Sequence, residues 1–187
     1  MKRIGDSIPG VLKSIEPHAL ETEYLGTKYR SRLEARWAIF LRHVGVHGWY
    51  EHEGFALPSG RYLPDFWLPT LGVFLEVKPE TPLSGSREFR LAGELAEHRQ
   101  CCVFVSSGPP WLDDGLTVFR SDGIVDSPYL FCECPECGRT GVEFQGLGDR
   151  ICGERCCGDR GRTPTHEALR FRDAMDAAKS ARFWEPA

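Results

Sequence analysis

The stretch of sequence that most constrains the fold is residues 62–78, Y-L-P-D-F-W-L-P-T-L-G-V-F-L-E-V-K. Its second part, residues 73–78, is rich in β-branched and aromatic residues and is followed by Pro79, which predicts a strand. Successive side chains of a strand point to opposite faces, so Glu76 and Lys78 share one face while the alternate residues face a core. Burying a carboxylate and an ammonium on so apolar a strand is costly unless they pair or bind a ligand. The strand therefore marks a candidate functional site.

A second acidic residue is expected beside this strand. Residues 66–68, F-W-L, read as a preceding strand, and residues 71–72 as the turn between the two. A hairpin of this length would bring Asp65 back beside Glu76. Two carboxylates at one place form a hard-oxygen site suited to Mg²⁺ or Mn²⁺. Lys78, a positive charge next to them, would orient a water or balance a developing negative charge.

A helix is predicted upstream of the hairpin, over residues 31–45. Its apolar residues recur at helical spacing and form one stripe, made of Leu33, Trp37, Phe40, Leu41 and Val44. Ser31 is a favourable N-cap, and Gly45 is a favourable stop. Glu34 lies three residues after Ser31, so the pair fits a capping box, an interpretation that needs no metal. In the alternative interpretation, Glu34 adds a third carboxylate to those of the hairpin.

The pattern P-D-x10-E-x-K within residues 64–78 resembles the signature of the PD-(D/E)XK, or restriction-endonuclease-like, nuclease superfamily. Many members carry a helical Glu upstream of the hairpin, and S-R-L-E-A-R-W-A-I-F at residues 31–40 resembles that element. The same stretch also resembles the corresponding helix of endonuclease subunits that cut transposon ends. The resemblance covers about residues 28–108. The match in order and spacing favours the functional interpretation of Glu34 over the capping one.

This resemblance implies an α/β fold, a restriction-endonuclease-like core with a mixed central β-sheet flanked by helices. It also implies hydrolysis of DNA phosphodiester bonds with one or two Mg²⁺ or Mn²⁺ ions. Asp65 and Glu76 would bind the metal. Glu34 would complete or orient the ligand shell, and Lys78 would assist the attacking water. All of these positions are filled in the sequence, so the signature is intact.

The rest of the predicted core follows the hairpin. Residues 86–98 read as a helix with its apolar side chains inward. Residues 101–105 read as a buried strand, in which Cys101 and Cys102 are small core residues. Strand, helix and strand in this order imply a parallel crossover, so the sheet is expected to be mixed. Residues 116–119 are a possible edge strand.

Five further polar side chains are weak candidates for a role at the site. Arg87 and Arg90 lie on the helix that follows the hairpin, and the resemblance implies that such a helix often contacts the phosphate. Glu51, His52 and Glu53 would be able to approach a metal from the segment before the hairpin. A solvated position is the simpler interpretation of Glu51 and His52, because an isolated histidine seldom serves as a ligand.

The spacing of the cysteines in the C-terminal third of the chain indicates a metal site. Six of the eight cysteines fall within residues 132–157, in the pattern C-E-C-P-E-C-G followed by I-C-G-E-R-C-C. The first run contains a zinc knuckle, in which two thiolates lie on one tight turn and a glycine relaxes the backbone. Four thiolates from two turns satisfy tetrahedral Zn²⁺ and close the site, so the zinc would be structural. The predicted ligands are Cys134, Cys137, Cys152 and Cys156, with Cys157 as the alternative to Cys156.

An iron–sulfur cluster is the rival occupant, because some nucleases of this superfamily hold one through cysteines on both sides of the nuclease core. No cysteine precedes residue 101 in this chain, which favours zinc. Free thiols without a metal are a poor explanation, because a segment with so little apolar content needs a metal in order to fold.

A closing helix is predicted over residues 163–182, with Thr163 as its cap and Pro164 in its first turn. The side chains expected to pack on the core are Leu169, Phe171, Met175, Ala178 and Phe183. The predicted organisation is an N-terminal arm at 1–26, a nuclease core at 27–131, a zinc-binding module at 132–160 and the C-terminal helix at 161–187, which packs on the core.

Composition limits the possible partners. The net charge of −4 and the isoelectric point of about 5.9 argue against a purely charge-driven nucleic-acid binder. Arginines are nevertheless locally enriched around residues 28–42 and 150–172, next to the acidic site and within the cysteine-rich segment. We expect no membrane segment and a cytoplasmic location, because the sequence contains neither an apolar run of membrane-spanning length nor a recognisable signal peptide.

The chain is therefore expected to be a metal-dependent DNA endonuclease, similar to small nucleases of phages and mobile elements. DNA would be its substrate, and a protein of a recombination or transposition complex is a possible partner. The alternative is a catalytically silent, zinc-stabilised module that binds nucleic acid or protein on a nuclease scaffold. The Lys at position 78 argues against this alternative, because a scaffold does not need Lys beside Glu. A thiol-based redox enzyme is a third class, which lacks the expected thioredoxin-like setting.

Overall fold

The computed structural model of this protein describes residues 19–111, 115–134, 137–144, 150–151 and 168–183. Within these residues the helices are α1 (Arg32–His43), α2 (Arg87–Arg99) and α3 (Leu169–Ser180). The strands are β1 (Thr22–Tyr24), β2 (Thr27–Tyr29), β3 (Trp49–Tyr50), β4 (Phe55–Leu57), β5 (Gly60–Tyr62), β6 (Phe66–Leu68), β7 (Val73–Lys78), β8 (Val103–Ser107), β9 (Leu116–Phe119), β10 (Val125–Glu133), β11 (Thr140–Phe144) and β12 (Arg150–Ile151). These elements make the chain an α/β protein, as the sequence predicted.

In the part of the chain that the structure describes, eight strands form one central sheet in the order β12-β11-β10-β9-β8-β7-β6-β3. Strands β7 and β8 are parallel and are joined by a crossover through α2, while the other neighbouring pairs are antiparallel. The predicted mixed sheet is therefore confirmed. Two small hairpins, β1–β2 and β4–β5, lie outside this sheet.

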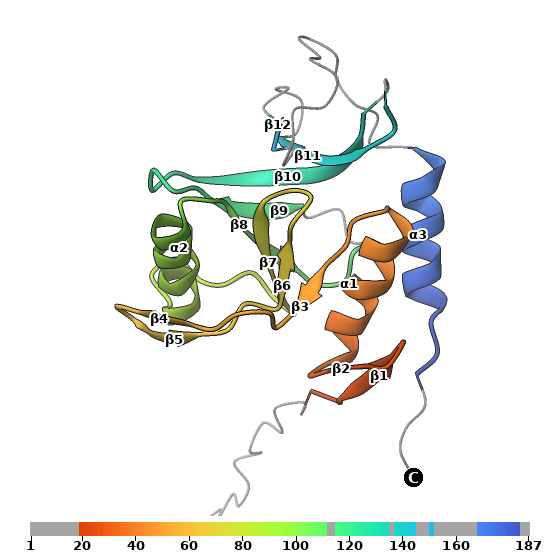
Figure 1. Cartoon of the computed structure of the whole chain (residues 1–187), viewed down its shortest axis with the longest axis horizontal. Helices are drawn as coiled ribbons and strands as arrows, with labels where there is room; N and C mark the ends of the chain where they lie inside the picture. The colour runs from red at the N-terminus through yellow and green to blue at the C-terminus, as the bar shows by residue number, and fades with distance from the viewer. Residues whose placement is uncertain (1–18, 112–114, 135–136, 145–149, 152–167, 184–187) are drawn as a thin grey trace, which may run out of the picture.

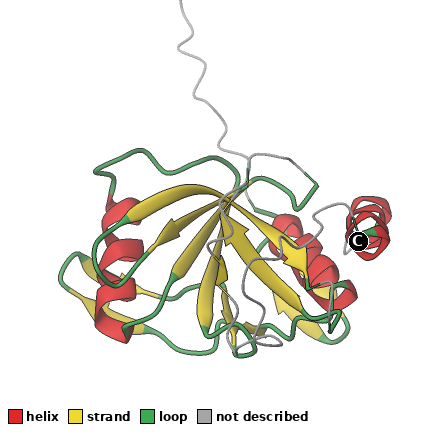
Figure 2. Cartoon of the chain, turned by 90° about the horizontal axis from the view of Figure 1, so that it is seen from above, coloured by secondary structure: helices red, strands yellow, loops and turns green. Residues whose placement is uncertain are grey.

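Helices cover both faces of the sheet, with α2 on one side and α1 and α3 on the other (Figures 1 and 2). Leu91 and Leu95 of α2 belong to one buried cluster with Phe74 of β7. Phe40 of α1 belongs to the opposite cluster with Leu75 of the same strand. Because β7 is covered on both faces, its sequence is a nearly continuous apolar run. Glu76 is thus a charged residue inside a two-sided core strand.

The two predicted core helices form almost as the sequence indicated, because each has a serine cap. Ser31 Oγ accepts a hydrogen bond from the backbone N–H of Glu34 at 3.2 Å at the start of α1. Ser86 Oγ accepts one from the N–H of Phe89 at 3.1 Å at the start of α2. Such bonds satisfy backbone donors that the first turn of a helix leaves unpaired.

The strands after α2 differ from the prediction. Strand β8 spans Val103–Ser107, so Cys101 and Cys102 precede it and are partly exposed, rather than lying in the strand. Strand β9 was predicted at an edge, and this is wrong, because β9 pairs with β8 on one side and β10 on the other. Strand β10 continues through the boundary predicted between residues 131 and 132, and β11 and β12 extend the same sheet.

The C-terminal helix is shorter than predicted. It begins at Leu169, and Ala168 before it has a non-helical backbone. Leu169 was expected to pack on the core, but it is 69% exposed. Phe171 is buried and lies 6.3 Å from Phe40 between ring centroids, so α3 does pack on α1. The predicted cap Thr163 lies outside the described residues.

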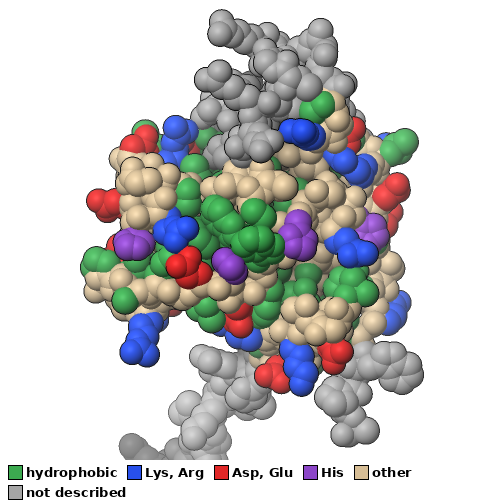
Figure 3. All heavy atoms as spheres, viewed as in Figure 1, with side chains coloured by type: hydrophobic (Ala, Val, Ile, Leu, Met, Phe, Trp, Pro, Cys, Tyr) green, Lys and Arg blue, Asp and Glu red, His purple; other side chains and the backbone are tan. Residues whose placement is uncertain are grey.

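The surface carries charges of both signs. On the face seen in Figure 3, Lys and Arg side chains are interspersed with Asp and Glu side chains. Such mixing means that this face has no broad region of a single charge sign. Within the described part of the chain, no helix has the length and apolar composition needed to cross a membrane.

Candidate active site

The β6–β7 hairpin brings the two predicted metal-binding carboxylates together. Phe66 pairs with Leu75 in the antiparallel register, so the residue before β6 meets the residue after Leu75. The backbone N–H of Asp65 donates a hydrogen bond to Glu76 Oε2 at 3.2 Å. Asp65 is 1% exposed and Glu76 is 3% exposed. The predicted juxtaposition of these two residues is therefore present in the structure.

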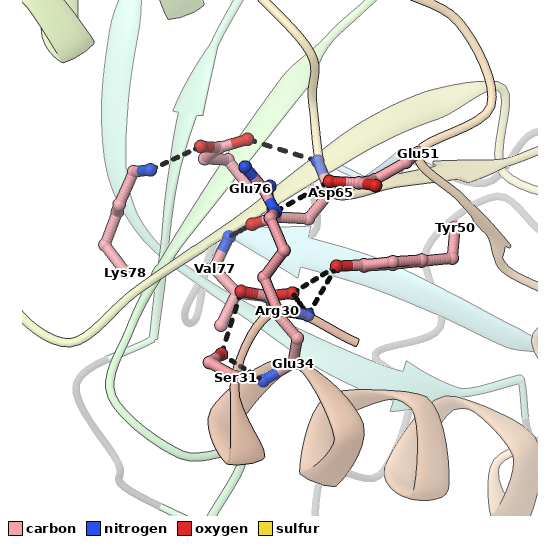
Figure 4. Close-up of polar contacts among 9 residues, drawn as sticks. All are labelled: Arg30, Ser31, Glu34, Tyr50, Glu51, Asp65, Glu76, Val77 and Lys78. Carbon is pink, nitrogen blue, oxygen red and sulfur yellow. Dashed lines mark hydrogen bonds and ion pairs between the residues drawn. The ribbon is translucent and has the colours of Figure 1, made fainter. Parts of the chain in front are cut away.

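The Asp65 carboxylate has a donor on each oxygen. The N–H of Val77 donates to Oδ2 at 2.7 Å, and Nη2 of Arg30 lies 2.6 Å from Oδ1 (Figure 4). Burial and the nearby Glu76 carboxylate raise the pKa of Asp65 to about 7, although the bond from Val77 lowers it. An additional cation nearby would stabilise the ionised form of a carboxyl group whose pKa is raised in this way.

Lys78 lies beside Glu76, as predicted, with its Nζ 2.5 Å from Glu76 Oε1. Burial lowers the pKa of Lys78, but the charge and hydrogen bond of Glu76 together with the charge of Asp65 outweigh it, so the pKa lies above its usual value. Lys78 therefore stays protonated at neutral pH and acts as a hydrogen-bond donor rather than a proton acceptor. Burial and Glu76 also raise the pKa of Tyr62, whose hydroxyl contacts the same carboxylate.

Glu34 takes part in helix capping and in the polar network of the site. Its backbone N–H bonds to Ser31 Oγ, and Ser31 in turn donates to Glu34 Oε1 at 2.8 Å. The other oxygen, Oε2, accepts from the hydroxyl of Tyr50 at 2.5 Å and from the N–H of Arg30 at 3.1 Å. The serine half of the predicted capping box is therefore present, and the role of Glu34 as a metal ligand stays a prediction. The contacts that the structure describes link Glu34 to Asp65 through Arg30 (Figure 4).

Arg30 was not assigned to the site by the sequence analysis, and Glu51 was named there only as a weak candidate for approaching a metal. Arg30 Nε lies 2.6 Å from Glu51 Oε1, while its Nη2 contacts Asp65. The N–H of Glu51 donates to the carbonyl of Asp65 at 2.8 Å, directly after β3. Glu51 was predicted to be a solvated strand end, and its side chain is instead 27% exposed and ion-paired. In the sequence, Arg30 lies just before the predicted helix and Glu51 lies in the segment before the predicted hairpin. These positions alone do not reveal that the two side chains are in contact.

The donor set suits a hard divalent cation, but the arrangement is not assembled around one. Each oxygen of Glu34, Asp65 and Glu76 accepts a bond or an ion pair from the protein. Within the described residues, no group of three or more His, Cys, Asp or Glu side chains is placed to hold a metal ion. Carboxylate oxygens are the ligands that Mg²⁺ and Mn²⁺ prefer, and the Arg30 guanidinium already provides a positive charge at Asp65. The oxygen chemistry of these residues therefore suits a divalent cation, while the positive charge at Asp65 is supplied by Arg30 in this structure.

The weaker candidates lie elsewhere. Arg87 Nη2 lies 3.4 Å from the carbonyl of Arg61, and Arg90 Nε lies 3.4 Å from Ser59 Oγ, so both tie α2 to the β4–β5 hairpin. His52 is exposed and packs on Trp49, with 4.5 Å between ring centroids. These contacts favour the simpler structural interpretation of all three side chains.

Two backbone hydrogen bonds join described residues where the zinc knuckle was predicted. The N–H of Gly138 donates to the carbonyl of Cys134 at 2.9 Å, and the N–H of Cys134 donates to the carbonyl of Arg139 at 2.8 Å. Gly138 has φ +67°, a conformation that glycine adopts without strain. Cys134 is buried and Cys137 is exposed. The other predicted ligands, Cys152, Cys156 and Cys157, lie outside the described residues.

Comparison of the chain with protein-family models, with curated proteins and with solved structures gives no match. The α/β architecture and its mixed sheet are observed directly. A family and an activity can therefore be proposed for this chain only from the residues of the candidate site and their geometry.

Proposed function

We propose that this protein is a metal-dependent DNA endonuclease of the PD-(D/E)XK superfamily. The observation that carries the proposal is the hairpin corner at which Asp65, Glu76 and Lys78 meet. Asp65 N–H bonds to Glu76 Oε2 at 3.2 Å, and Lys78 Nζ lies 2.5 Å from Glu76 Oε1. Three charged groups on a buried hairpin cost folding free energy, which favours a functional reason for their presence.

The proposed roles follow from charge and position. Asp65 and Glu76 hold Mg²⁺ or Mn²⁺, and Glu34 completes or orients the ligand shell from α1. The bound metal supplies Lewis-acid stabilisation of the phosphate and makes a water more acidic. Lys78 keeps its proton, because its pKa is raised, and donates a hydrogen bond that positions the water or stabilises negative charge.

A structural zinc ion is the second part of the proposal. The turn at Cys134 and Cys137 would provide two thiolates, and Cys152 and Cys156 the other two, with Cys157 as the alternative to Cys156. Four thiolates leave no open position on Zn²⁺, so the module would stabilise the chain rather than catalyse. It would place DNA or a protein of a recombination or transposition complex against the nuclease core.

One observation favours a second candidate, a catalytically silent module that binds nucleic acid or protein. In the structure, the Arg30 guanidinium lies against Asp65 at 2.6 Å, and the carboxylates already have protein donors. Carboxylates whose charge is balanced by protein side chains and hydrogen-bond donors do not need a metal ion for stability. This candidate predicts binding without metal-dependent cleavage.

The test is cleavage of supercoiled, linear, single-stranded and branched DNA in Mg²⁺ or Mn²⁺ by the folded, zinc-loaded protein. The proposal predicts metal-dependent cleavage that Lys78→Ala abolishes and Lys28→Ala leaves intact. Lys28 is a matched control, because it is an exposed lysine on β2 that the site does not use. Binding of DNA without cleavage of any of these substrates would favour the silent module.

A further inference from the structure

Arg30 is the residue at the candidate site whose presence most needs an explanation. Its guanidinium bridges two carboxylates, with Nη2 at 2.6 Å from Asp65 Oδ1 and Nε at 2.6 Å from Glu51 Oε1 (Figure 4). The side chain of Asp65 is 2% exposed, whereas that of Arg30 is 53% exposed. An arginine that reaches from solvent onto a buried carboxylate supplies the positive charge that a metal ion would also supply.

The main chain of Arg30 is anchored independently of its guanidinium. Its N–H donates to Glu34 Oε2 at 3.1 Å and to the hydroxyl of Tyr50 at 2.9 Å. These bonds hold the residue just before the first turn of α1. The half-exposed side chain extends beyond this anchor, so it can rotate toward solvent without any change in the backbone.

Glu51 holds its carboxylate near the Arg30 head group by a strained backbone. Its φ of +45° lies in the left-handed region, which is unfavourable for a residue with a side chain. The bond from its N–H to the carbonyl of Asp65 at 2.8 Å keeps the residue in that conformation. Strain of this kind persists where the surrounding structure enforces it and is frequent at functional sites.

We propose that Arg30 is a resident cation of the site, which leaves Asp65 when a divalent cation binds and then contacts the phosphate of the DNA substrate. This inference rests on the proposed nuclease function. Two cations competing for Asp65 Oδ1 repel each other, so the guanidinium withdraws, and Glu51 retains it at the mouth of the site. The planar guanidinium is suited to bidentate binding of phosphate.

Metal binding without DNA tests the first half of this proposal. Isothermal titration with Mn²⁺ would compare the full-length, zinc-loaded wild type with Arg30→Ala, Arg30→Gln and the control Lys28→Ala. We expect the Arg30 variants to bind Mn²⁺ about tenfold more tightly, because a charge-assisted contact no longer competes. If Arg30→Ala does not fold, the comparison uses Arg30→Gln, which removes the charge with a smaller loss of side-chain length. An unchanged Mn²⁺ affinity in folded Arg30 variants would overturn the proposal.

DNA binding tests the second half. Fluorescence anisotropy of a short duplex in Ca²⁺, over a range of salt concentrations, would compare the same variants. Loss of one phosphate contact should weaken binding by Arg30→Gln and lower the slope of log K against log salt by about 0.9. A slope equal to that of the wild type would refute the phosphate contact. If the wild type cleaves DNA with a metal but the Arg30 variants bind Mn²⁺ and DNA as the wild type does, the role of Arg30 is refuted and the nuclease proposal stands. Failure of the Arg30 proposal can therefore be distinguished from failure of the nuclease proposal.

Discussion

The backbone N–H of Asp65 donates to Glu76 Oε2 at 3.2 Å, so two acidic residues share one buried corner of the β6–β7 hairpin. Lys78 supplies positive charge to Glu76, and Arg30 supplies it to Asp65 (Figure 4). Buried carboxylates of this kind make the stability of the protein dependent on pH.

The first prediction concerns that pH dependence. The pKa of Asp65 is raised to about 7 in the folded state from 3.8, so its ionisation opposes folding. The protonated carboxyl of Asp65 contributes its full share to the free energy of unfolding below about pH 4, and this contribution is lost as the pH rises through 7. The variant Asp65→Asn cannot ionise at this position and should not show this loss. In zinc-loaded protein without Mg²⁺ or Mn²⁺, its free energy of unfolding should therefore rise relative to that of the wild type by on the order of 2 kcal/mol between pH 4.5 and pH 8. Urea unfolding across this range measures the difference, and a constant difference would contradict the prediction.

Local patterns were sufficient for the hairpin, for α1 and for the Asp65–Glu76 contact. Caps and turn residues act within a few positions, and the hairpin register follows from its short loop. The contact between Arg30 and Glu51 was missed because it depends on β3 pairing with β6, where Trp49 faces Trp67. That pairing joins segments separated by a second hairpin, and no local pattern encodes it.

The other misses have similar causes. Strand β10 was overlooked because its first half is polar and contains Pro128, a residue that argues against a central strand. The structure accommodates Pro128 where the register of β10 against β9 shifts between Asp126 and Tyr129. The start of α3 was placed too early because Thr163-Pro164 is a common helix start, whereas the helix begins at Leu169.

The second prediction tests the Glu34–Tyr50 contact. Glu34 is 7% exposed, and Tyr50 donates to its Oε2 at 2.5 Å. Tyr50→Phe and Glu34→Gln should each lower the free energy of unfolding by about 1–2 kcal/mol, because a charge-assisted hydrogen bond is lost or weakened. The double variant should lose less than the sum of the two, with a coupling above about 0.5 kcal/mol. Strict additivity would show that the two side chains do not interact in solution.

The third prediction concerns Gly115, which precedes β9. It has φ +70°, and a Cβ atom there would lie 2.6 Å from Cβ of Pro128 and 3.0 Å from the carbonyl oxygen of Tyr129. Gly115→Ala should therefore cost about 2–4 kcal/mol of stability through clash and backbone strain.

Gly72 is the matched control for this substitution. It has φ +68°, and nothing lies within 4 Å of a Cβ atom built on it. Gly72→Ala should thus show the backbone strain alone, about 1 kcal/mol. Chemical denaturation measures both variants, and equal losses would show that the close approach to Pro128 is absent in solution.

The fourth prediction concerns zinc. Cys134→Ser and Cys137→Ser should each reduce the bound zinc from about one ion per chain and lower the melting temperature, because a structural Zn²⁺ site stabilises the fold. Cys132→Ser is the control, since Cys132 is buried but is not a predicted ligand. Elemental analysis by mass spectrometry measures the metal content. Iron and sulfide in place of zinc, or full zinc in the Cys134 variant, would contradict the assignment.

The most direct test of the nuclease proposal is Glu76→Gln, a change that removes one charge from the candidate site and keeps the shape of the side chain. Glu97→Gln, at an exposed position of α2, is its matched control. The assay is conversion of supercoiled plasmid to nicked and linear forms in Mn²⁺, with folding and zinc content verified for each protein. We predict cleavage by the wild type and by Glu97→Gln, and a loss of at least about a hundredfold for Glu76→Gln. Equal cleavage by all three proteins would contradict the assignment of Glu76 to the active site.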